Sequence, residues 1–410
     1  MCKMEWREIG RACCLTHVTT VPDSLWAFFG GQIAYMKSRG LDIQAVSSRG
    51  NLLDAFAERE QTRVQQISML RRMSPARDLF AVFQLSRFLQ HTRPTIVHGH
   101  TPKGGLLAML AAYFVRTPIR LYHLRGLPLE TATGWKRRLL RATERLTCRL
   151  AHRVLCNSES LRREAIRWNL CPPEKIRVLH HGSGNGVDSV RRLAPTRFNG
   201  VAVREKLGIP PHVPVFGYVG RIARDKGILD LSDAWDQLAR LHPELHWLVV
   251  GERDSRDGIP EALMKRLKDD PRVHLAGFQF DPAEAYAAMD LCVLPTYREG
   301  FPNVLLEAAA MEVPVVATRV TGCVDAVQDG VTGTLVPPRQ PEVLQRAISR
   351  YLNDPQLRKR HGKAGRKRAL RDFRPQDIWE ALYEEYVSLL NERGLPVPHP
   401  PPPREVRVAA

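Results

Sequence analysis

The nine residues Glu299-Gly300-Phe301-Pro302-Asn303-Val304-Leu305-Leu306-Glu307 decide the fold of this chain, because they predict a turn from a strand into a helix. The apolar run 291–294 before them predicts a short buried strand, and the run 308–311 after them predicts helix. Pro302 suits the first helical position, where its missing N–H would have had no partner. The turn therefore directs free backbone N–H groups beyond the carboxyl end of the strand, where the positive end of the helix dipole favours a diphosphate.

The two carboxylates that bound this stretch have different predicted partners. Glu307 falls on the first or second helical turn, where its oxygens can accept hydrogen bonds from ribose hydroxyls. Glu299 lies at the strand end, in position to meet the next group along, a sugar. The alternative is that Glu299 caps a helix and Glu307 is a solvated helix residue. The stretch resembles the retaining nucleotide-sugar glycosyltransferases of family 4, and further motifs extend the resemblance over roughly residues 15–390.

A second motif, Gly220-Arg221-Ile222-Ala223-Arg224-Asp225-Lys226-Gly227, directly follows the first predicted strand of the second half. Its spacing puts Arg221 at the strand end and Lys226 at the start of the next helix, so both cations can point at one pair of phosphates. Two cations suit a diphosphate leaving group, because charge builds on it as the glycosidic bond breaks. Family 4 enzymes carry an Arg and a Lys in that role, and the chain has no Asp-x-Asp pair, which implies a transferase without a metal. The resemblance implies the following donor-binding residues: Gly30, Gly31, Arg221, Lys226, Gly300, Phe301, Pro302, Asn303 and Glu307.

Glycines and a histidine follow predicted strands in the first half. The pair Gly30-Gly31 enters a helix and lets backbone approach a ligand closely. His100 ends a strand and resembles the family histidine that lies beside the donor sugar, so His100 and Glu299 are the predicted catalytic residues, with a structural core histidine as the alternative. Many family members have His-Gly where this chain has Arg125-Gly126, which implies a different or more anionic acceptor. The predicted acceptor-side residues are Lys103, Arg125 and Glu130.

Short apolar runs alternate with amphipathic stretches of helical length along the whole chain, which is typical of parallel sheets covered by helices. A break in this periodicity near residues 187–200 separates two doubly wound α/β domains. Two facing Rossmann-like domains with a cleft between them form the GT-B arrangement, which the resemblance also implies. We expect an N-terminal acceptor-side domain at 1–190, a C-terminal nucleotide-sugar domain at 200–372, a terminal helix at 373–395 and a proline-rich disordered tail at 396–410. The predicted strands span residues 12–18, 42–46, 95–97, 120–124, 154–156, 176–179, 215–219, 246–250, 273–275, 291–294 and 313–317.

The formal net charge of +18 lies entirely in the first half of the chain. Residues 1–200 carry 32 Lys and Arg against 14 Asp and Glu, whereas residues 201–410 carry 29 of each. This asymmetry indicates an anionic partner, namely nucleic acid, a membrane surface or a phosphorylated substrate, and a solvated face is the alternative. The basic stretch 135–153 predicts an amphipathic helix that can lie on an anionic membrane. Its packing residues are predicted to be Leu139, Leu140, Leu146 and Leu150.

The chain has no apolar run long enough for a membrane span and no signal-type run at its start, so we expect a cytoplasmic protein, with peripheral contact at the inner face of the cell membrane as an option. The eight cysteines show no Cys-x-x-Cys pair and are read as small core residues of a reduced protein.

The sequence and the resemblance together predict a retaining glycosyltransferase that needs no cofactor. Its donor is expected to be a nucleoside diphosphate sugar, with UDP as the commonest base among relatives, and its acceptor a glycan, polyprenyl-diphosphate-linked, in capsule, exopolysaccharide or O-antigen synthesis. Two alternatives remain open at this point. One is a sugar-nucleotide epimerase of the same fold, and the other is a basic membrane- or nucleic-acid-binding protein without catalysis, although the basic half shows no zinc finger or aromatic-rich single-strand platform.

Overall fold

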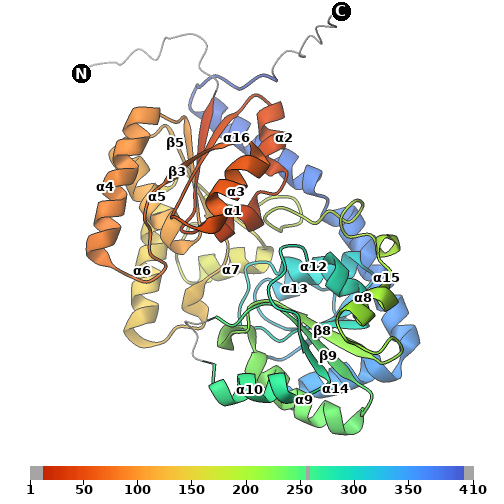
Figure 1. The fold of residues 1–410 in the computed structure, drawn as a ribbon. Helices are drawn as coiled ribbons and strands as arrows, with labels where there is room; N and C mark the ends of the chain where they lie inside the picture. The colour runs from red at the N-terminus through yellow and green to blue at the C-terminus, as the bar shows by residue number, and fades with distance from the viewer. Residues whose placement is uncertain (1–12, 255–258, 401–410) are drawn as a thin grey trace, which may run out of the picture.

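The computed structural model describes residues 13–254 and 259–400, and they form two α/β domains, one above the other in Figure 1. The N-terminal domain contains a seven-stranded sheet in the order β3-β2-β1-β4-β5-β6-β7, and every pairing in it is parallel. Its strands are β1 (Cys14–Val18), β2 (Asp42–Ser47), β3 (Arg63–Gln66), β4 (Ile96–His100), β5 (Ile119–Leu124), β6 (Arg153–Cys156) and β7 (Ile176–Val178).

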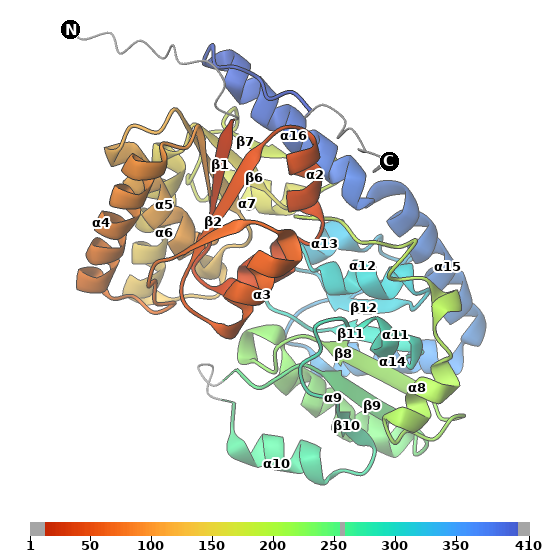
Figure 2. The same ribbon diagram turned by 45° about the horizontal axis from the view of Figure 1, so that its top comes forward.

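Helices cover both faces of this sheet, as buried parallel strands require. Helices α4, α5 and α6 pack side by side on one face, at the left of Figures 1 and 2. The helices of this domain are α1 (Pro22–Phe28), α2 (Gln32–Ser38), α3 (Asn51–Glu60), α4 (Pro75–Thr92), α5 (Pro102–Phe114), α6 (Gly134–Leu150) and α7 (Glu159–Arg167), with a short 3₁₀ turn η1 (Pro128–Glu130).

The C-terminal domain repeats the same plan with a six-stranded parallel sheet in the order β10-β9-β8-β11-β12-β13. Its strands are β8 (Val215–Val219), β9 (His246–Val250), β10 (Val273–Leu275), β11 (Leu291–Leu294), β12 (Val315–Thr318) and β13 (Gly333–Val336). Its helices are α8 (Gly200–Lys206), α9 (Ile228–Leu241), α10 (Glu261–Asp269), α11 (Ala283–Ala287), α12 (Asn303–Ala310), α13 (Cys323–Ala326), α14 (Pro341–Asn353) and α15 (Pro355–Asp372), with 3₁₀ turns η2 (Pro195–Arg197) and η3 (Arg224–Lys226).

The strand order reverses direction once in each sheet, between β1 and β4 and between β8 and β11. In open α/β sheets, ligands bind beyond the carboxyl ends of the strands at such a switch point. Each domain therefore has one edge where functional side chains are expected to gather.

The last helix, α16 (Pro375–Glu392), returns to the N-terminal domain, and Figure 2 shows α15 and α16 running along the right side of both domains. Its residues Leu382, Tyr386 and Leu389 are buried in the same apolar cluster as Leu15 and Ile43 of the N-terminal sheet. The cation of Arg153 lies 2.7 Å from Glu385 of α16, which adds a buried ion pair to this contact. The C-terminal helix therefore belongs to the N-terminal core by packing, although it follows the other domain in the chain.

All eleven strands predicted from the sequence are present, with ends shifted by up to three residues. Two edge strands were missed. The residues of β3 are polar except for Val64 and are mostly exposed, and β13 begins at Gly333 in a region that reads as turns. Neither strand shows the apolar pattern on which the prediction rested.

The expected C-terminal helix at 373–395 is present as α16, with ends shifted by two and three residues because Phe373 caps α15 and α16 starts at Pro375. The prediction of disorder from residue 396 onward was wrong for the part of the tail that the structure describes. The start of the proline-rich tail is packed rather than disordered: Leu395 and Val397 lie on the N-terminal apolar cluster, and the Tyr383 hydroxyl donates to the Pro398 carbonyl at 3.3 Å. Proline prevents regular structure but not side-chain packing, and residues 401–410 lie outside the described part of the chain.

Candidate functional site

The carboxyl ends of β8 and β11 bring together the cations and the carboxylate that the sequence predicted for the donor. Lys226 Nζ lies 2.5 Å from Glu299 Oε1, and both side chains are largely buried. Arg221 is paired with Asp254 and lies 3.5 Å from Asp225. The site therefore holds two cations whose charges are compensated by carboxylates from the protein itself.

The second glutamate of the motif, Glu307, is held from both sides. Arg192 Nη2 donates to Glu307 Oε1 at 2.8 Å, and the Tyr286 hydroxyl donates to Oε2 at 3.0 Å. Burial, followed by the charge of Glu307, raises the pKa of Tyr286 well above its usual value, so this hydroxyl keeps its proton. Each carboxylate oxygen has a second lone pair, so Glu307 retains acceptor capacity for ribose hydroxyls.

The start of α12 differs by one position from the prediction. Pro302 is the N-cap, with extended backbone angles, and the helix begins at Asn303. Glu307 is the fifth helical residue and therefore lies on the second turn. The first N–H groups of a helix lack a partner four residues back, although Leu305 N–H donates to the Pro302 carbonyl at 3.1 Å. Their contact with a diphosphate stays a prediction.

The loop before α12 touches the N-terminal domain directly. A Cβ built on Gly300 would lie 1.9 Å from the carbonyl oxygen of Arg125, so only glycine permits this approach of two backbones. The Ser158 hydroxyl donates to the Gly300 carbonyl at 2.7 Å. Asn303 accepts from Ser183 at 2.9 Å, which joins the domains a second time.

Phe301, the remaining member of this loop, is buried. Its ring lies 5.5 Å from that of Phe373 and contacts Gly182. It therefore anchors the loop, whereas a direct contact with a donor stays a prediction.

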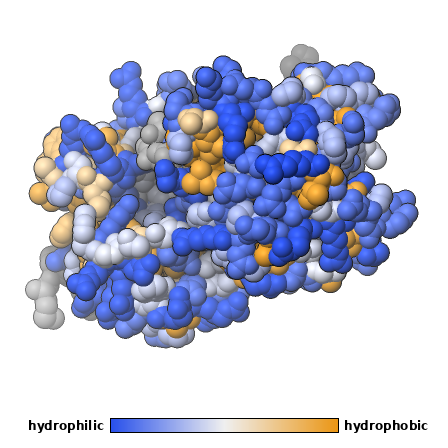
Figure 3. Space-filling model, turned by 90° about the horizontal axis from the view of Figure 1, so that it is seen from below, coloured by the Kyte–Doolittle hydropathy of each residue, from blue (hydrophilic) through white to orange (hydrophobic). Residues whose placement is uncertain are grey.

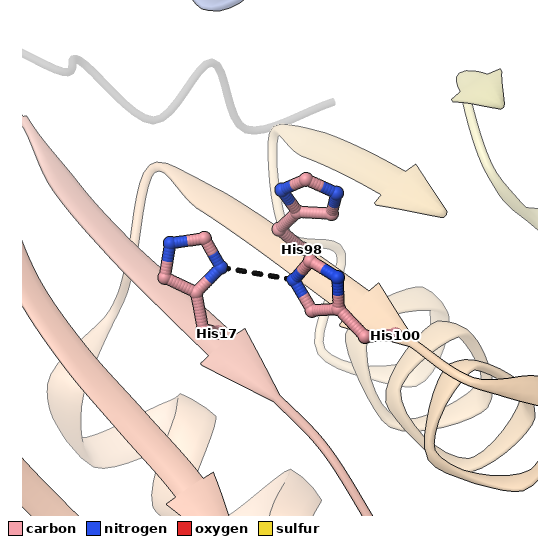
Figure 4. A group of neighbouring side chains, drawn as sticks. All are labelled: His17, His98 and His100. Carbon is pink, nitrogen blue, oxygen red and sulfur yellow. Dashed lines mark hydrogen bonds between the residues drawn. The ribbon is translucent and has the colours of Figure 1, made fainter. Parts of the chain in front are cut away.

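Histidines from neighbouring strands occupy the switch point of the N-terminal sheet. His17 lies on β1, His98 and His100 lie on β4, and their rings gather between the two strands in Figure 4. His17 Nδ1 and His100 Nε2 are 3.0 Å apart, the contact drawn as a dashed line. His98 Nδ1 lies 2.7 Å from the Tyr386 hydroxyl of α16, and His123 of β5 meets Asn157 at 2.8 Å.

All four of these histidines are neutral. Burial, assisted by the charge of Arg125, lowers the pKa of His17 to about 3. Burial also lowers the pKa of His98, His100 and His123 well below the usual range. The cluster therefore carries no charge of its own at neutral pH.

Arg125 follows β5 and contacts this cluster. Its Nε and Nη2 each lie 3.4 Å from His100 Nδ1, and its guanidinium carbon stacks 3.9 Å from the Phe28 ring centroid. His100, the predicted catalytic residue, is fully buried, and both its ring nitrogens are engaged by His17 and Arg125. The group that lies nearer to the C-terminal domain is Arg125, which is partly exposed and whose backbone meets Gly300.

The predicted glycine pair lies beside this cluster, because the preceding Phe29 ring packs 5.0 Å from His100. Gly31 has φ +76°, and a Cβ there would lie 2.8 Å from Trp379 of α16, so it must be glycine for structural reasons. Gly30 has open space around it, which fits a close approach of ligand.

Two predicted acceptor-side residues have partners elsewhere. Lys103 Nζ pairs with Asp78 of α4 at 2.7 Å, so its charge is used within the domain. Glu130 Oε1 accepts from Thr321 of the C-terminal domain at 2.5 Å, and burial raises the pKa of Glu130. Lys103 thus stabilises a contact within the N-terminal domain and Glu130 a contact between the domains. Contact with an acceptor stays a prediction for each.

Sequence reasoning missed His17, Asp254, Tyr286 and, as a site residue, Arg192. His17 is the penultimate residue of the first strand, so the rule that strand ends carry function could have found it. Arg192 and Tyr286 reach Glu307 from segments 115 and 21 residues away, and no local pattern indicates such a contact.

The nitrogens of His17, His98 and His100 lie within 4.8 Å of one another, a spacing that can suit a metal ion. The donor set does not fit one, because His100 already uses both nitrogens and a guanidinium lies beside it. A dication would be repelled by that charge.

The fold and these strand-end side chains define a class: GT-B proteins, in which two facing Rossmann-like domains hold a site between them. Models of two known families match the chain, the glycosyl transferase 4-like domain over residues 25–182 and glycosyl transferases group 1 over residues 213–354. The chain is 35% identical to the capsular polysaccharide biosynthesis glycosyltransferase CapM of Staphylococcus aureus over 377 residues. This alignment covers 92% of this chain and 97% of CapM. The chain therefore belongs to the family 4 glycosyltransferases, and it is an enzyme.

More distant relatives agree with this assignment. A UDP-Gal:alpha-D-GlcNAc-diphosphoundecaprenol alpha-1,3-galactosyltransferase of Escherichia coli is 24% identical over 290 residues, which cover 70% of this chain and 74% of that enzyme. The crystal structure of Anabaena HepE in complex with UDP-glucose superposes with a TM-score of 0.75 at 21% identity, covering 92% of this chain and all of HepE. This last likeness confirms the predicted GT-B fold.

Proposed function

We propose that this glycosyltransferase moves a sugar from a UDP-linked donor to a lipid-linked glycan acceptor, with retention of configuration, in the synthesis of a cell-surface polysaccharide. The likeness to CapM over nearly the whole of both chains supports the polysaccharide role. The named donor and diphosphoundecaprenol acceptor of the Escherichia coli relative support the substrate classes. The alternatives of an epimerase and of a non-catalytic binding protein gain no support from these relatives.

The observation that carries the proposal is the grouping of Lys226, Arg221 and Glu299 at the switch point of the C-terminal sheet. In the proposed complex the donor diphosphate takes the place of Glu299 as the partner of Lys226. The released Glu299 then accepts hydrogen bonds from hydroxyls of the donor sugar. This exchange keeps the cation compensated before and after binding, which limits the cost of burying the charges.

The first-turn amides of α12 face the same diphosphate, and Glu307 accepts from the ribose. Arg192 and Tyr286 fix the orientation of Glu307, so that little side-chain entropy is lost when the nucleotide binds. Each of these contacts is available before the ligand arrives, which is the condition for effective electrostatic stabilisation of a leaving group.

In the proposed reaction the acceptor hydroxyl attacks the anomeric carbon on the face from which the diphosphate departs. The bond from the anomeric carbon to the phosphate oxygen breaks, the bond to the acceptor oxygen forms, and the departing phosphate takes the acceptor proton. Lys226 and Arg221 stabilise the negative charge that develops on the phosphates. His100 acts from behind the reacting centre by holding Arg125 in position.

Calorimetric titration with UDP-, GDP- and ADP-linked sugars, without added metal, tests the donor site. We expect the UDP-linked sugar to bind and Glu307→Ala to weaken that binding by about 10- to 100-fold, as for loss of hydrogen bonds to a charged acceptor. Glu342→Ala, at an exposed position of α14, is the matched control and should bind as wild type. Binding of only a GDP- or ADP-linked sugar would contradict the UDP-linked donor, and failure of wild type to bind any of the three would contradict the transferase reaction as well.

The N-terminal domain also presents a surface suited to an anionic membrane. On α6, Trp135 is 70% exposed beside Arg137 and Arg138, whereas the buried residues of this helix are Glu144, Thr147 and Cys148. The sequence prediction was therefore wrong about Leu139 and Leu146, which are exposed instead of packed.

On the same side of the sheet, α4 exposes Leu79, Phe80 and Phe83. No helix in the described ranges 13–254 and 259–400 is long and apolar enough to cross a membrane. The face of the molecule seen in Figure 3 is mostly hydrophilic, with hydrophobic side chains in small separate groups. Peripheral docking through the outer faces of α4 and α6 would bring the enzyme to a lipid-linked acceptor, because apolar side chains flanked by arginine bind anionic interfaces.

Vesicle sedimentation at low salt tests this docking. We expect wild type to bind vesicles that contain anionic lipid and not neutral vesicles. The Arg137→Glu, Arg138→Glu double variant should bind anionic vesicles more weakly and should be less active on a lipid-linked acceptor. Equal binding by wild type and the double variant would rule out this surface.

A further inference from the structure

Arg125 differs from the other arginines of the site because no carboxylate compensates it. Within the described ranges no Asp or Glu oxygen lies within 4.0 Å of its guanidinium nitrogens. Its contacts are the neutral ring of His100 and the face of Phe28. Burial lowers the pKa of Arg125 to about 9, so it stays charged at neutral pH. A partly buried cation without an anion is costly in a folded protein, and a charged group perturbed in this way is a candidate for binding an anionic ligand.

The surrounding residues hold this cation in one orientation. A Cβ built on Gly184 would lie 2.2 Å from Arg125 Nη1, so the absence of a side chain at Gly184 makes room for the guanidinium. Phe28 stacks on one side of the planar group, and Nε and Nη2 both face His100 Nδ1. Nη1 is left without a hydrogen-bond acceptor among the described residues.

The hydrogen-bond chain behind Arg125 has a fixed direction. Arginine has donors only, so His100 Nδ1 must accept from it. Neutral His100 therefore carries its proton on Nε2 and donates to His17 Nδ1 at 3.0 Å. Neutral His17 then carries its proton on Nε2, which has no partner in the described part of the chain. The histidines thus act as one support that accepts from the back of Arg125 and leaves its free edge for a ligand.

The position of Arg125 relates this cation to the reacting centre. Its carbonyl oxygen abuts Gly300, the residue that follows Glu299. A group bound by its free edge would therefore lie between the donor loop and the end of the N-terminal sheet, where donor sugar and acceptor must meet.

We propose that Arg125 binds an oxyanion carried by a substrate at this meeting point, either the carboxylate of an acidic donor sugar or a phosphate of the lipid-linked acceptor. This inference rests on the proposed function and adds a charge requirement to it. A carboxylate and a phosphate each offer two oxygens that can accept parallel N–H···O bonds from the two nitrogens of a planar guanidinium. Arg125 is then a specificity-determining residue, and His100 is a positioning residue behind it.

The test measures binding of UDP, UDP-glucose, UDP-glucuronate, farnesyl diphosphate and farnesol to wild type, Arg125→Gln and Arg125→Lys. If the oxyanion is on the donor, wild type binds UDP-glucuronate about 10-fold or more tightly than UDP-glucose, and Arg125→Gln abolishes that difference. If it is on the acceptor, wild type binds farnesyl diphosphate and not farnesol, and Arg125→Gln loses this binding. Arg125→Lys, which keeps the charge without the fork, should retain part of either preference.

UDP carries neither the sugar nor the lipid, so its binding tests the donor site of the proposed function and does not depend on the role proposed for Arg125. Absence of UDP binding by wild type would contradict the proposed function. Normal UDP binding together with equal affinity of wild type and Arg125→Gln for every anionic probe would overturn the role of Arg125. Melting temperatures of both variants serve as the folding control, and Arg125→Lys decides the matter if Arg125→Gln does not fold.

Discussion

The two switch points differ in whether their cationic side chains are paired with carboxylates. At the C-terminal switch point Arg221, Lys226 and Arg192 of the segment between the domains are each paired with a carboxylate of the C-terminal domain. In the N-terminal domain Arg125 is supported by a neutral imidazole and an aromatic ring. The sheets have the same strand order around their switch points apart from the extra edge strand β7, so the difference lies in the side chains at the strand ends.

This contrast indicates two ways of preparing a site for an anion. Paired cations cost little to bury and can exchange a protein carboxylate for a phosphate when the ligand binds. An unpaired cation costs more in the free enzyme but discriminates strongly, because a neutral ligand leaves it uncompensated. Paired cations suit the diphosphate, which every donor molecule carries. An unpaired cation suits discrimination between charged and neutral substrates.

The largest effect is expected from the paired side. Lys226→Ala should lower kcat/KM by about 10²- to 10³-fold, because one of the two cations on the leaving diphosphate is lost and Glu299 is left buried without its partner. Steady-state kinetics with the donor identified by titration provides the measurement. Lys265→Ala, an exposed lysine of α10, is the control and should be unaffected. A loss of less than fivefold in Lys226→Ala would remove Lys226 from the leaving-group site.

The neutral histidines predict a stability change with pH in the other domain. His17, His98, His100 and His123 have pKa values far below 6.5 in the folded protein, so below pH 6.5 the unfolded chain binds more protons and the free energy of unfolding falls. Buried Glu144, whose pKa burial raises to about 7, acts in the opposite sense. From pH 6.5 to 5.5 these five groups together should cost about 3 kcal/mol.

Urea unfolding at a series of pH values measures this change. The free energy of unfolding should decrease steadily from pH 6.5 to 5.5. A flat or rising profile in that range would mean that the cluster is not held neutral, and the direction inferred for its hydrogen bonds would fail with it.

Removal of the cation on Glu307 should have a moderate effect. Arg192→Ala frees one oxygen of Glu307 from its partner and is expected to weaken UDP binding by about 10-fold, less than Glu307→Ala, because the Tyr286 contact remains. Calorimetry compares it with Arg346→Ala, an exposed arginine of α14. Tighter nucleotide binding by Arg192→Ala would mean that Arg192 competes with the ribose for Glu307.

The smallest effect is expected at the contact between α16 and the histidine cluster. Tyr386→Phe removes the hydroxyl that meets His98 Nδ1 at 2.7 Å and should lower the free energy of unfolding by about 1 kcal/mol. Donor binding should not change, because the substitution leaves the C-terminal sheet intact. Tyr383→Phe, whose hydroxyl makes a longer and more exposed contact with Pro398, should cost less. A larger loss in Tyr383→Phe would contradict the importance assigned to the buried contact.

Much of the fold was predictable because parallel strands buried on both faces leave apolar runs of characteristic length. The motifs around Glu299 and Lys226 were also predictable, since a functional side chain at a strand end is followed at once by a helix start. Local pattern fails where a contact is made at long range. The packing of α16 on the N-terminal sheet and the pairing of Glu307 with Arg192 join segments whose sequences carry no mutual signal.

The sequence by itself determined two doubly wound domains, the donor motif and the uneven distribution of charge. These follow from the apolar periodicity of the chain and from the identities of residues at strand ends. Only the tertiary structure decided which charges are compensated. Lys226 and Arg125 are both basic residues after a parallel strand, yet one lies 2.5 Å from a carboxylate and the other rests on an imidazole, because compensation depends on what the fold brings within a few ångströms.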